Sequence, residues 1–303
     1  MRGYQVTDPR DRIYALLGLA SDSTLLKILP DYSMSHTQLF TDVATAMMWH
    51  LQNVDHLSYC YRSTSQLELP SWVPNWTIQK RQMPILSNTF DASRNPLSRF
   101  EILLDSKLRL SSLIAGEILA MCETSWAVPK PKPESETSHT SKTKSLNSLA
   151  RTVLTDISCL VRRHSGSYAE EEEIAKLATY TACAGLDLRS DGSWARHVHS
   201  YSLYSKIMRQ DQLSDPAKLY CASVANRSSQ RKAFVTKNGY FGIGPSSTQI
   251  GDFAVILLGG RVPYLLRHVN GNGYVLVGEC YVYGIMDGEL LSSGKEFSDI
   301  FII

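Results

Sequence analysis

The sequence lacks the features that mark several large classes of protein. No apolar run approaches the roughly 20 residues that a membrane helix needs. Residues 1–20 lack the basic, apolar and small-residue regions of a secretory signal. The 31 basic and 29 acidic residues leave a net charge of +2, which gives no general attraction to nucleic acid or anionic lipid. We therefore expect neither a nucleic-acid nor a membrane partner.

Cysteine is sparse, and no two cysteines have the CxxC spacing of zinc or redox sites. The six cysteines are Cys60, Cys122, Cys159, Cys183, Cys221 and Cys280. In a chain of 303 residues this scatter is typical of reduced thiols in a reducing compartment. The cysteines thus predict a cytoplasmic protein without structural disulfides.

Sequence motifs of the common catalytic and cofactor sites are missing too. No GxSxG, HExxH or EF-hand pattern occurs, Gly242-Ile243-Gly244 lacks the dinucleotide-binding spacing, and Gly259-Gly260 is not followed by a P-loop lysine. His197 and His199 have strand-like spacing for zinc, but no third ligand lies close in sequence. We expect no cofactor and no metal.

Strand signals are densest in residues 251–289. Short apolar, β-branched runs alternate there with glycine turns, and a glycine at position 278 indicates a bend or bulge inside a strand. Residues 233–243 add a hairpin around Asn238-Gly239. About five short antiparallel strands of this kind predict a small β-barrel or rolled sheet.

Helical signals precede this region. Asp8 and Pro9 are typical of a helix start, and Gly18 of a left-handed helix end. Ser35 opens a capping box before an amphipathic run to Leu51. Further helices are predicted in residues 146–161, 170–177, 194–208 and 216–224, and further strands in residues 57–61, 100–104, 108–110 and 114–121. The fold class is α+β, with helical modules, short strands and the C-terminal barrel.

Composition divides the chain into four parts. Residues 127–145 combine prolines and mixed charge with no large apolar side chain after Val128, which predicts a disordered linker or insertion. We therefore expect a helical and short-stranded module in residues 1–126, a helical module in 146–226, and the barrel in 227–303.

Few residues are candidates for catalysis or ligand binding. Cys280 and His268, on neighbouring predicted strands, are the one plausible nucleophile and base, and would indicate a cysteine-dependent hydrolase or transferase. A small barrel is also compatible with binding of single-stranded nucleic acid, although basic residues are few among its aromatics. The loop holding Trp72 and Trp76 is predicted to be pinned into the core by its rings, with ligand stacking as the alternative.

Several blocks carry a resemblance to one family. Residues 8–19 (DPRDRIYALLGL), 30–33 (PDYS) and 69–76 (LPSWVPNW), together with 239–242 (GYFG), 259–263 (GGRVP) and 278–289 (GECYVYGIMDGE), resemble fungal heterokaryon incompatibility (HET) proteins in the same order. The matching positions, for which we expect structural roles, are Asp8, Pro9, Arg10, Asp11, Tyr14, Gly18, Pro30, Asp31, Tyr32, Trp72, Pro74, Trp76, Gly251, Asp252, Pro263, Gly278, Glu279, Gly284 and Gly288.

This resemblance implies a role in self/non-self recognition and regulated cell death, with other proteins as partners. In relatives the first block follows an amino-terminal HET domain, similar to Toll/interleukin-1-receptor domains, whose opening reads like ALSYxWG; this sequence has no such segment. Met1 lies shortly before Asp8, so we expect a truncated relative. The resemblance then implies a chain that is not catalytic by itself and that binds a full-length relative.

Overall fold

The structure is a computed structural model, and it describes residues 6–17, 27–61, 69–78, 83–94, 97–128, 139–165, 170–209, 212–269 and 273–303. Its helices are α1 (Asp11–Leu17), α3 (His36–Leu51), η1 (Asp55–Tyr59), α4 (His139–His164), α5 (Glu171–Ala182), α6 (Tyr201–Arg209), α7 (Asp215–Ser228) and η2 (Glu289–Ser293). Its strands are β1 (Phe100–Ile102), β2 (Leu108–Met121), β3 (Leu186–Leu188), β4 (Trp194–Arg196), β5 (Arg231–Thr236), β6 (Phe241–Pro245), β7 (Phe253–Leu257), β8 (Tyr264–Val269), β9 (Gly273–Glu279), β10 (Tyr281–Val282) and β11 (Ser298–Ile302). No helix in these ranges is both long and apolar enough to cross a bilayer.

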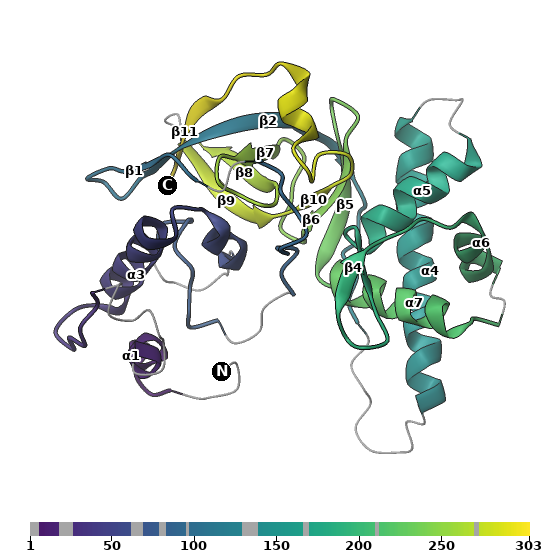
Figure 1. Ribbon diagram of the computed structural model, residues 1–303, viewed down its shortest axis with the longest axis horizontal. Coiled ribbons are helices and arrows are strands. Elements are labelled where there is room, and N and C mark those ends of the chain that lie inside the picture. Colours follow the sequence, from purple (N-terminus) through teal and green to yellow (C-terminus); the bar gives the residue numbers. More distant parts are fainter. Residues whose placement is uncertain are drawn as a thin grey trace.

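Five strands close into a ring at the centre of the molecule (Figure 1). Around the ring, β2 pairs with β7, β7 with β8, β8 with β9, β9 with β11, and β11 returns to β2. The pairing of β9 with β11, in which Ile302 lies opposite Tyr274, is parallel. The other four pairings are antiparallel. The predicted α+β class with a barrel-like sheet is confirmed.

The long strand β2 belongs to two parts of the sheet. Residues 108–117 pair with β1, β11 and β7, and the last residues, from Ile118 to Met121, pair with β5. Register shifts near Gly116 and after Ile118 bend the strand, as bulges do. From β5 the sheet continues through β6 to β10. The barrel therefore extends beyond residues 227–303, because β2 comes from the first of the predicted modules.

Helices cover the sheet at two places. The helices α4, α5, α6 and α7 pack together beside β5 and β6, while α1 and α3 lie on the other side, below the ring (Figure 1). In α4, the buried side chains of Val153, Ile157 and Leu160 recur every three or four residues and so form one face of the helix. One hydrophobic cluster connects α3, the helical layer and the sheet, and a second joins side chains from β2, β7, β8 and β9.

Three predicted elements differ in the structure. Residues 57–61 were predicted as a strand but contribute to the 3-10 helix η1, because Asn53 accepts a hydrogen bond from the amide of Asp55 and starts a turn. The helix predicted for residues 194–208 is wrong in its first part, which forms strand β4 after a tight turn. Within the predicted linker 127–145, helix α4 already begins at His139, and residues 129–138 lie outside the described ranges.

The corner at Gly278 shows how the chain leaves the ring. Gly278 has a φ of +146°, and a Cβ atom there would lie 2.8 Å from Cγ of Pro245. The pairing of β8 with β9 shifts register beside it, and the amide of Cys280 then binds the carbonyl of Pro263. After this bend β10 pairs with β6 instead of continuing along β8. The bend predicted at Gly278 thus redirects the chain from the ring to the β5–β6 hairpin.

Replacing Gly278 by alanine is expected to destabilise the fold by roughly 1–3 kcal/mol, because the new side chain meets both a strained backbone and Pro245. The matched control is Gly239→Asn, since Gly239 also has a positive φ but open space around it, and asparagine tolerates that conformation. Urea unfolding measures both variants. Equal midpoints for Gly278→Ala and the wild type would contradict this account of the corner.

Candidate functional site

The first two motif blocks meet through Arg10. Its guanidinium binds the Asp8 carboxylate, with Nη2 at 2.7 Å from Oδ2 and Nε at 3.0 Å from Oδ1. Its Nη1 donates to the backbone carbonyls of Tyr32 and Met34, at 2.6 and 2.7 Å. The ion pair with Arg10 lowers the pKa of Asp8. Arg10 therefore connects the start of α1 to the segment before α3. The planar guanidinium of arginine can donate to a carboxylate and to two carbonyls at once, a geometry that the ammonium of lysine does not reproduce.

Tyrosines complete this connection. The hydroxyl of Tyr14 donates to the carbonyl of Asp31 at 2.8 Å, and the hydroxyl of Tyr32 donates to Asp11 at 2.7 Å. The two tyrosine rings meet edge to face, with centroids 5.3 Å apart. Pro9 is half-buried and Pro30 is exposed beside this network. Gly18, the predicted helix end, lies outside the described residues.

The third block, residues 69–76, is pinned into the core. Trp72 is fully buried, and its ring nitrogen donates to the carbonyl of Ser106 at 2.9 Å. Pro74 is buried beside it, and Trp76 packs edge to face against Phe40 of α3. The backbone amide of Ser71 donates to Ile303 at the end of the chain, at 2.9 Å. These contacts place the Trp72 ring inside the protein.

His56 lies beneath this loop. Burial lowers the pKa of His56 to about 4, although a backbone hydrogen bond to Trp72 opposes the shift. The thiol of Cys60 donates to the carbonyl of the same tryptophan at 3.2 Å. The His56 imidazole is therefore neutral at physiological pH and forms part of the packing between η1 and the loop.

The carboxy-terminal block contains a buried ion pair. The Glu279 carboxylate accepts hydrogen bonds from the amides of Ile85 and Leu86, at 2.5 and 3.0 Å, and lies 3.2 Å from Nη2 of Arg231. Arg231 also donates to the carbonyls of Arg227 and Met83, at 2.7 and 2.8 Å. Burial raises the pKa of Glu279, while Arg231 and the two amides act against that shift.

A second buried carboxylate lies at the other end of the ring. Asp252 is 1% exposed and binds Arg267 through two contacts of 2.8 and 3.0 Å. It also accepts a hydrogen bond from the amide of Gln249 at 2.7 Å, which closes the turn that contains Gly251. Asp252 thus holds the start of β7 beside β8, to which Arg267 belongs.

The remaining motif glycines lie between β10 and η2. Gly284 follows β10, and Gly288 directly precedes η2, where a Cβ atom would clash with the side chain of Arg94. Between them, Asp287 forms an ion pair with Arg196 of β4, whose guanidinium lies 4.3 Å from the Phe90 ring centroid. This segment therefore connects the sheet to the helical layer.

The predicted nucleophile and base do not meet. Cys280 lies beyond the end of β9, where its amide donates to Pro263, whereas His268 faces Tyr274 at the opposite end of β8. Cys280 is fully buried, and burial raises the pKa of its thiol well above the ordinary value. The prediction that neighbouring strands bring these two side chains together is wrong, because the register separates them along β8.

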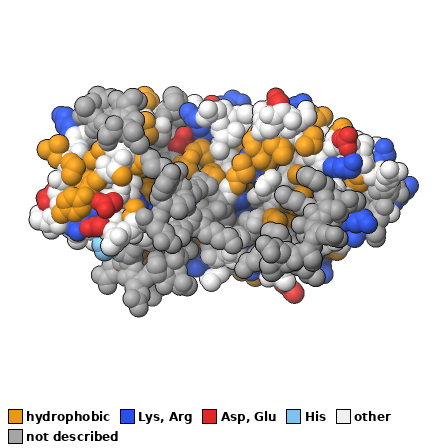
Figure 2. Space-filling view, turned by 90° about the horizontal axis from the view of Figure 1, so that it is seen from below, with side chains coloured by type: hydrophobic (Ala, Val, Ile, Leu, Met, Phe, Trp, Pro, Cys, Tyr) orange, Lys and Arg blue, Asp and Glu red, His pale blue; other side chains and the backbone are white. Residues whose placement is uncertain are grey.

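An exposed apolar surface lies at the end of α3. We name the exposed side chains of Trp49, Leu51 and Leu97 the α3 patch. The Trp49 ring packs edge to face on Phe100, and Ser98 binds the carbonyl of Gln52, so the two segments run side by side. Seen from below, apolar side chains are also exposed among charged ones on the α1 and α3 side of the molecule (Figure 2).

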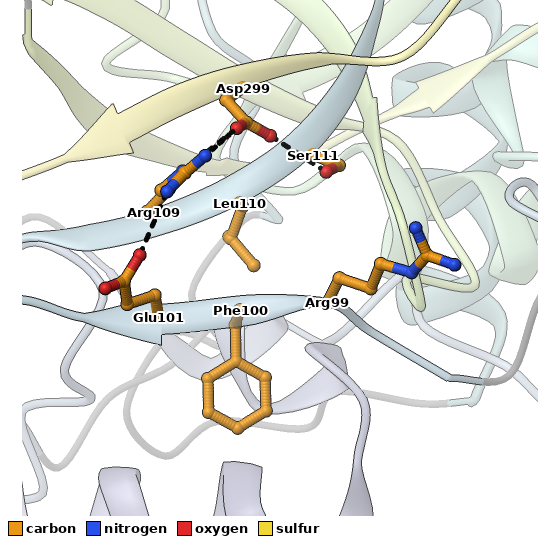
Figure 3. A pocket seen from close by; sticks show the side chains of 7 residues that line it. All are labelled: Arg99, Phe100, Glu101, Arg109, Leu110, Ser111 and Asp299. Carbon is orange, nitrogen blue, oxygen red and sulfur yellow. Dashed lines mark hydrogen bonds and ion pairs between the residues drawn. The ribbon is translucent and has the colours of Figure 1, made fainter.

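A charged groove adjoins the α3 patch (Figure 3). Arg109 of β2 binds both Glu101 of β1 and Asp299 of β11, at 3.0 and 2.5 Å, and Asp299 accepts a further bond from Ser111. The side chain of Arg99 extends away from this network. The groove thus presents paired charges beside the apolar side chains of Phe100 and Leu110.

One cluster of side chains with metal-binding atoms was not predicted from the sequence. His197, considered there with His199, lies instead with Cys183 and Asp187, and one possible ligand atom from each residue is within 4.8 Å of the others. His199 binds the Thr179 hydroxyl at 3.0 Å. The cluster was missed because the β3–β4 turn brings together residues that no motif spacing connects.

The fold defines a class: a small mixed β-barrel with an attached helical layer. Residues 128–303 match the profile of the Het-6 beta-barrel domain, and since this is more than half of the 303 residues, the chain belongs to that family. The resemblance of the sequence blocks to heterokaryon incompatibility proteins is thereby confirmed.

A curated relative extends the match to nearly the whole chain. The chain is 26% identical over 353 aligned positions to Heterokaryon incompatibility protein 6, OR allele, of Neurospora crassa. The alignment covers 98% of this chain and 51% of that protein, so the chain spans about half the length of the relative. No solved structure matches the chain.

His56 makes stability depend on pH. The unfolded chain takes up a proton on this side chain near pH 6.5, whereas the folded chain does so near pH 4. The buried neutral ring therefore makes its full contribution to the free energy of unfolding above pH 6.5. This contribution is lost as the pH falls toward 4, and the loss amounts to up to about 3 kcal/mol. We expect the free energy of unfolding to fall less steeply over this range in His56→Gln than in wild type. The exposed His50→Gln is the control, and identical slopes in the His56 variant and the wild type would contradict the assignment.

Breaking the Arg231–Glu279 pair is expected to be costly. Glu279→Gln removes a buried charge partner and should lower the free energy of unfolding by roughly 3–5 kcal/mol. The control is Glu117→Gln, which breaks the exposed Lys237–Glu117 pair and should cost about 1 kcal/mol or less. Chemical denaturation of both variants tests the difference, and similar losses would show that the buried pair has no special role.

Proposed function

We propose that this chain acts in heterokaryon incompatibility, as a recognition and regulatory part that binds another protein and does not itself catalyse a reaction. The observation that carries this proposal is the match of 98% of the chain to an incompatibility protein. In this proposal the chain works in the cytoplasm, contributes to self/non-self recognition and controls regulated cell death that a fuller relative carries out.

The contacts of the motif residues indicate that these residues have structural roles. Arg10, Trp72, Asp252 and Glu279 each bind several protein atoms, and of these Trp72, Asp252 and Glu279 are buried. Their hydrogen bonds hold neighbouring segments in place. A recognition role therefore requires a surface elsewhere on the molecule, formed by side chains that folding leaves accessible.

The α3 patch is the surface that we assign to this role. Trp49 is 60% exposed and Leu97 59% exposed, and tryptophan is among the residues that most often carry the binding energy of protein interfaces. A hollow beside them is lined by Leu51, Phe90 and Arg261, and the Arg261 side chain pairs with Asp55. The patch thus combines apolar anchors with a polar rim.

The partner in this proposal is a longer relative of the same family. The relative from Neurospora crassa is about twice as long as the part that this chain matches, and it therefore contains segments that this chain does not align with. Binding of such a relative would let the shorter chain damp or prime its activity without any chemistry of its own.

Co-precipitation tests the proposal. The full chain, expressed in a fungal host with the Neurospora crassa relative, should be retained with it, and the double variant Trp49→Asp/Leu97→Asp should reduce retention by about tenfold or more. Ile250→Asp is the matched control, because Ile250 is equally exposed, at 66%, but lies in the turn before β7.

Cell death and NAD content are scored in the same cultures. The chain alone should cause neither growth arrest nor loss of NAD. Death or NAD loss from this chain alone would overturn the non-catalytic assignment. Retention that is unchanged by the double variant would overturn the assignment of the α3 patch.

A further inference from the structure

Three side chains with metal-binding atoms meet behind the β3–β4 hairpin. Cys183 follows the end of α5, Asp187 is the central residue of β3, and His197 follows β4. One atom of each, the sulfur, a carboxylate oxygen and a ring nitrogen, lies within 4.8 Å of the other two. Cys183 is fully buried and His197 is 3% exposed.

The local fold holds these residues in fixed positions. Gly185, at a φ of +69°, turns the chain from α5 into β3, and its carbonyl accepts the amide of His197 at 2.9 Å. The His197 ring lies between those of Tyr180 and Tyr220, with centroids 4.7 and 5.2 Å away. The cluster is therefore built into the junction of a helix and a hairpin.

The hydrogen bonds of the cluster leave two atoms unsatisfied. Nδ1 of His197 binds Oδ2 of Asp187 at 2.8 Å, but the buried atoms His197 Nε2 and Asp187 Oδ1 have no hydrogen-bond partner among the residues that the structure describes. Burying polar atoms without partners is unfavourable, and native proteins rarely do so. Coordination of a cation by Oδ1 of Asp187 would supply the interaction that this oxygen lacks.

We propose that Cys183, Asp187 and His197 bind one zinc ion. Thiolate, imidazole and carboxylate are the ligands that Zn²⁺ prefers, and its bond lengths require ligand atoms about 3.3–3.6 Å apart in a tetrahedron. Zinc binding would replace the 2.8 Å hydrogen bond between Nδ1 of His197 and Oδ2 of Asp187, and side-chain rotations would bring the ligand atoms, which lie within 4.8 Å of one another, to the tetrahedral separations. Thiolate and carboxylate together balance the two positive charges of the ion, so the buried site is neutral overall.

The fourth position of such a site faces solvent. Asp187 is one of the residues that line a groove of about 500 Å³, together with Leu188, Val198 and Tyr220. A water molecule from this groove completes the tetrahedron. The ion would connect α5 to the hairpin that carries Arg196. Through the Arg196–Asp287 pair, that hairpin is connected to the motif block of residues 278–289. The role of the ion is thus to stabilise the junction between helical layer and sheet.

Cobalt substitution tests the site directly. The full chain, expressed without a polyhistidine tag, is stripped with chelator and titrated with Co²⁺ in the absence of oxygen. One equivalent is expected to bind, with the near-ultraviolet band of a thiolate–cobalt bond and the visible bands of tetrahedral coordination. Zinc, added to the same sample, should displace the cobalt and raise the thermal midpoint.

Two variants and one control decide the outcome. Cys183→Ser should abolish the thiolate band, and Asp187→Asn, which keeps an oxygen for His197, should weaken cobalt binding at least about tenfold. Cys221→Ser, at an equally buried thiol on α7, should leave the titration unchanged. Failure of the wild type to bind cobalt, a thiolate band that survives in Cys183→Ser, or unchanged affinity in Asp187→Asn would each overturn the proposal.

Discussion

The buried pair of Arg231 and Glu279 fixes four segments of this protein to one another. Arg231 begins β5 and Glu279 ends β9, so the pair joins the ring to the extension of its sheet. The same two side chains bind the backbone of residues 83–86 and, through Arg227, the end of α7. Because neither charge is exposed to water, each depends on the other and on these backbone groups, and the four segments are fixed together.

The second constraint is the closure of the ring by strands that are distant in sequence. Strand β11, at the end of the chain, lies between β2 and β9, while the final residue binds the loop of Trp72. This arrangement joins the first and last parts of the chain in one core. The surface that we propose for recognition, at the end of α3, therefore lies on elements held by the sheet, since Trp49 packs on Phe100 of β1 and β1 pairs with β2.

Local signals in the sequence were sufficient for many elements. Ser35 caps α3 as its capping box indicates, because its hydroxyl oxygen accepts a hydrogen bond from the amide of Gln38. The β5–β6 hairpin turns at Asn238-Gly239, as predicted. The α+β class and the family were predicted from such blocks. The α3 patch was not, because Leu51 continues the predicted apolar face of this helix and only the packing shows that Leu51 and Trp49 remain exposed beside Leu97.

What the sequence by itself determined were features that depend on neighbouring residues: helix starts, turns, strand content and the family blocks. Tertiary structure alone decided which strands pair, since hydrogen bonds between β2 and β7 or β11 join residues more than a hundred positions apart that share no local signal. It also separated Cys280 from His268 and brought Cys183, Asp187 and His197 together. Spacing along a chain cannot predict such meetings, because strand register and the direction of a turn fix them only after the core has formed.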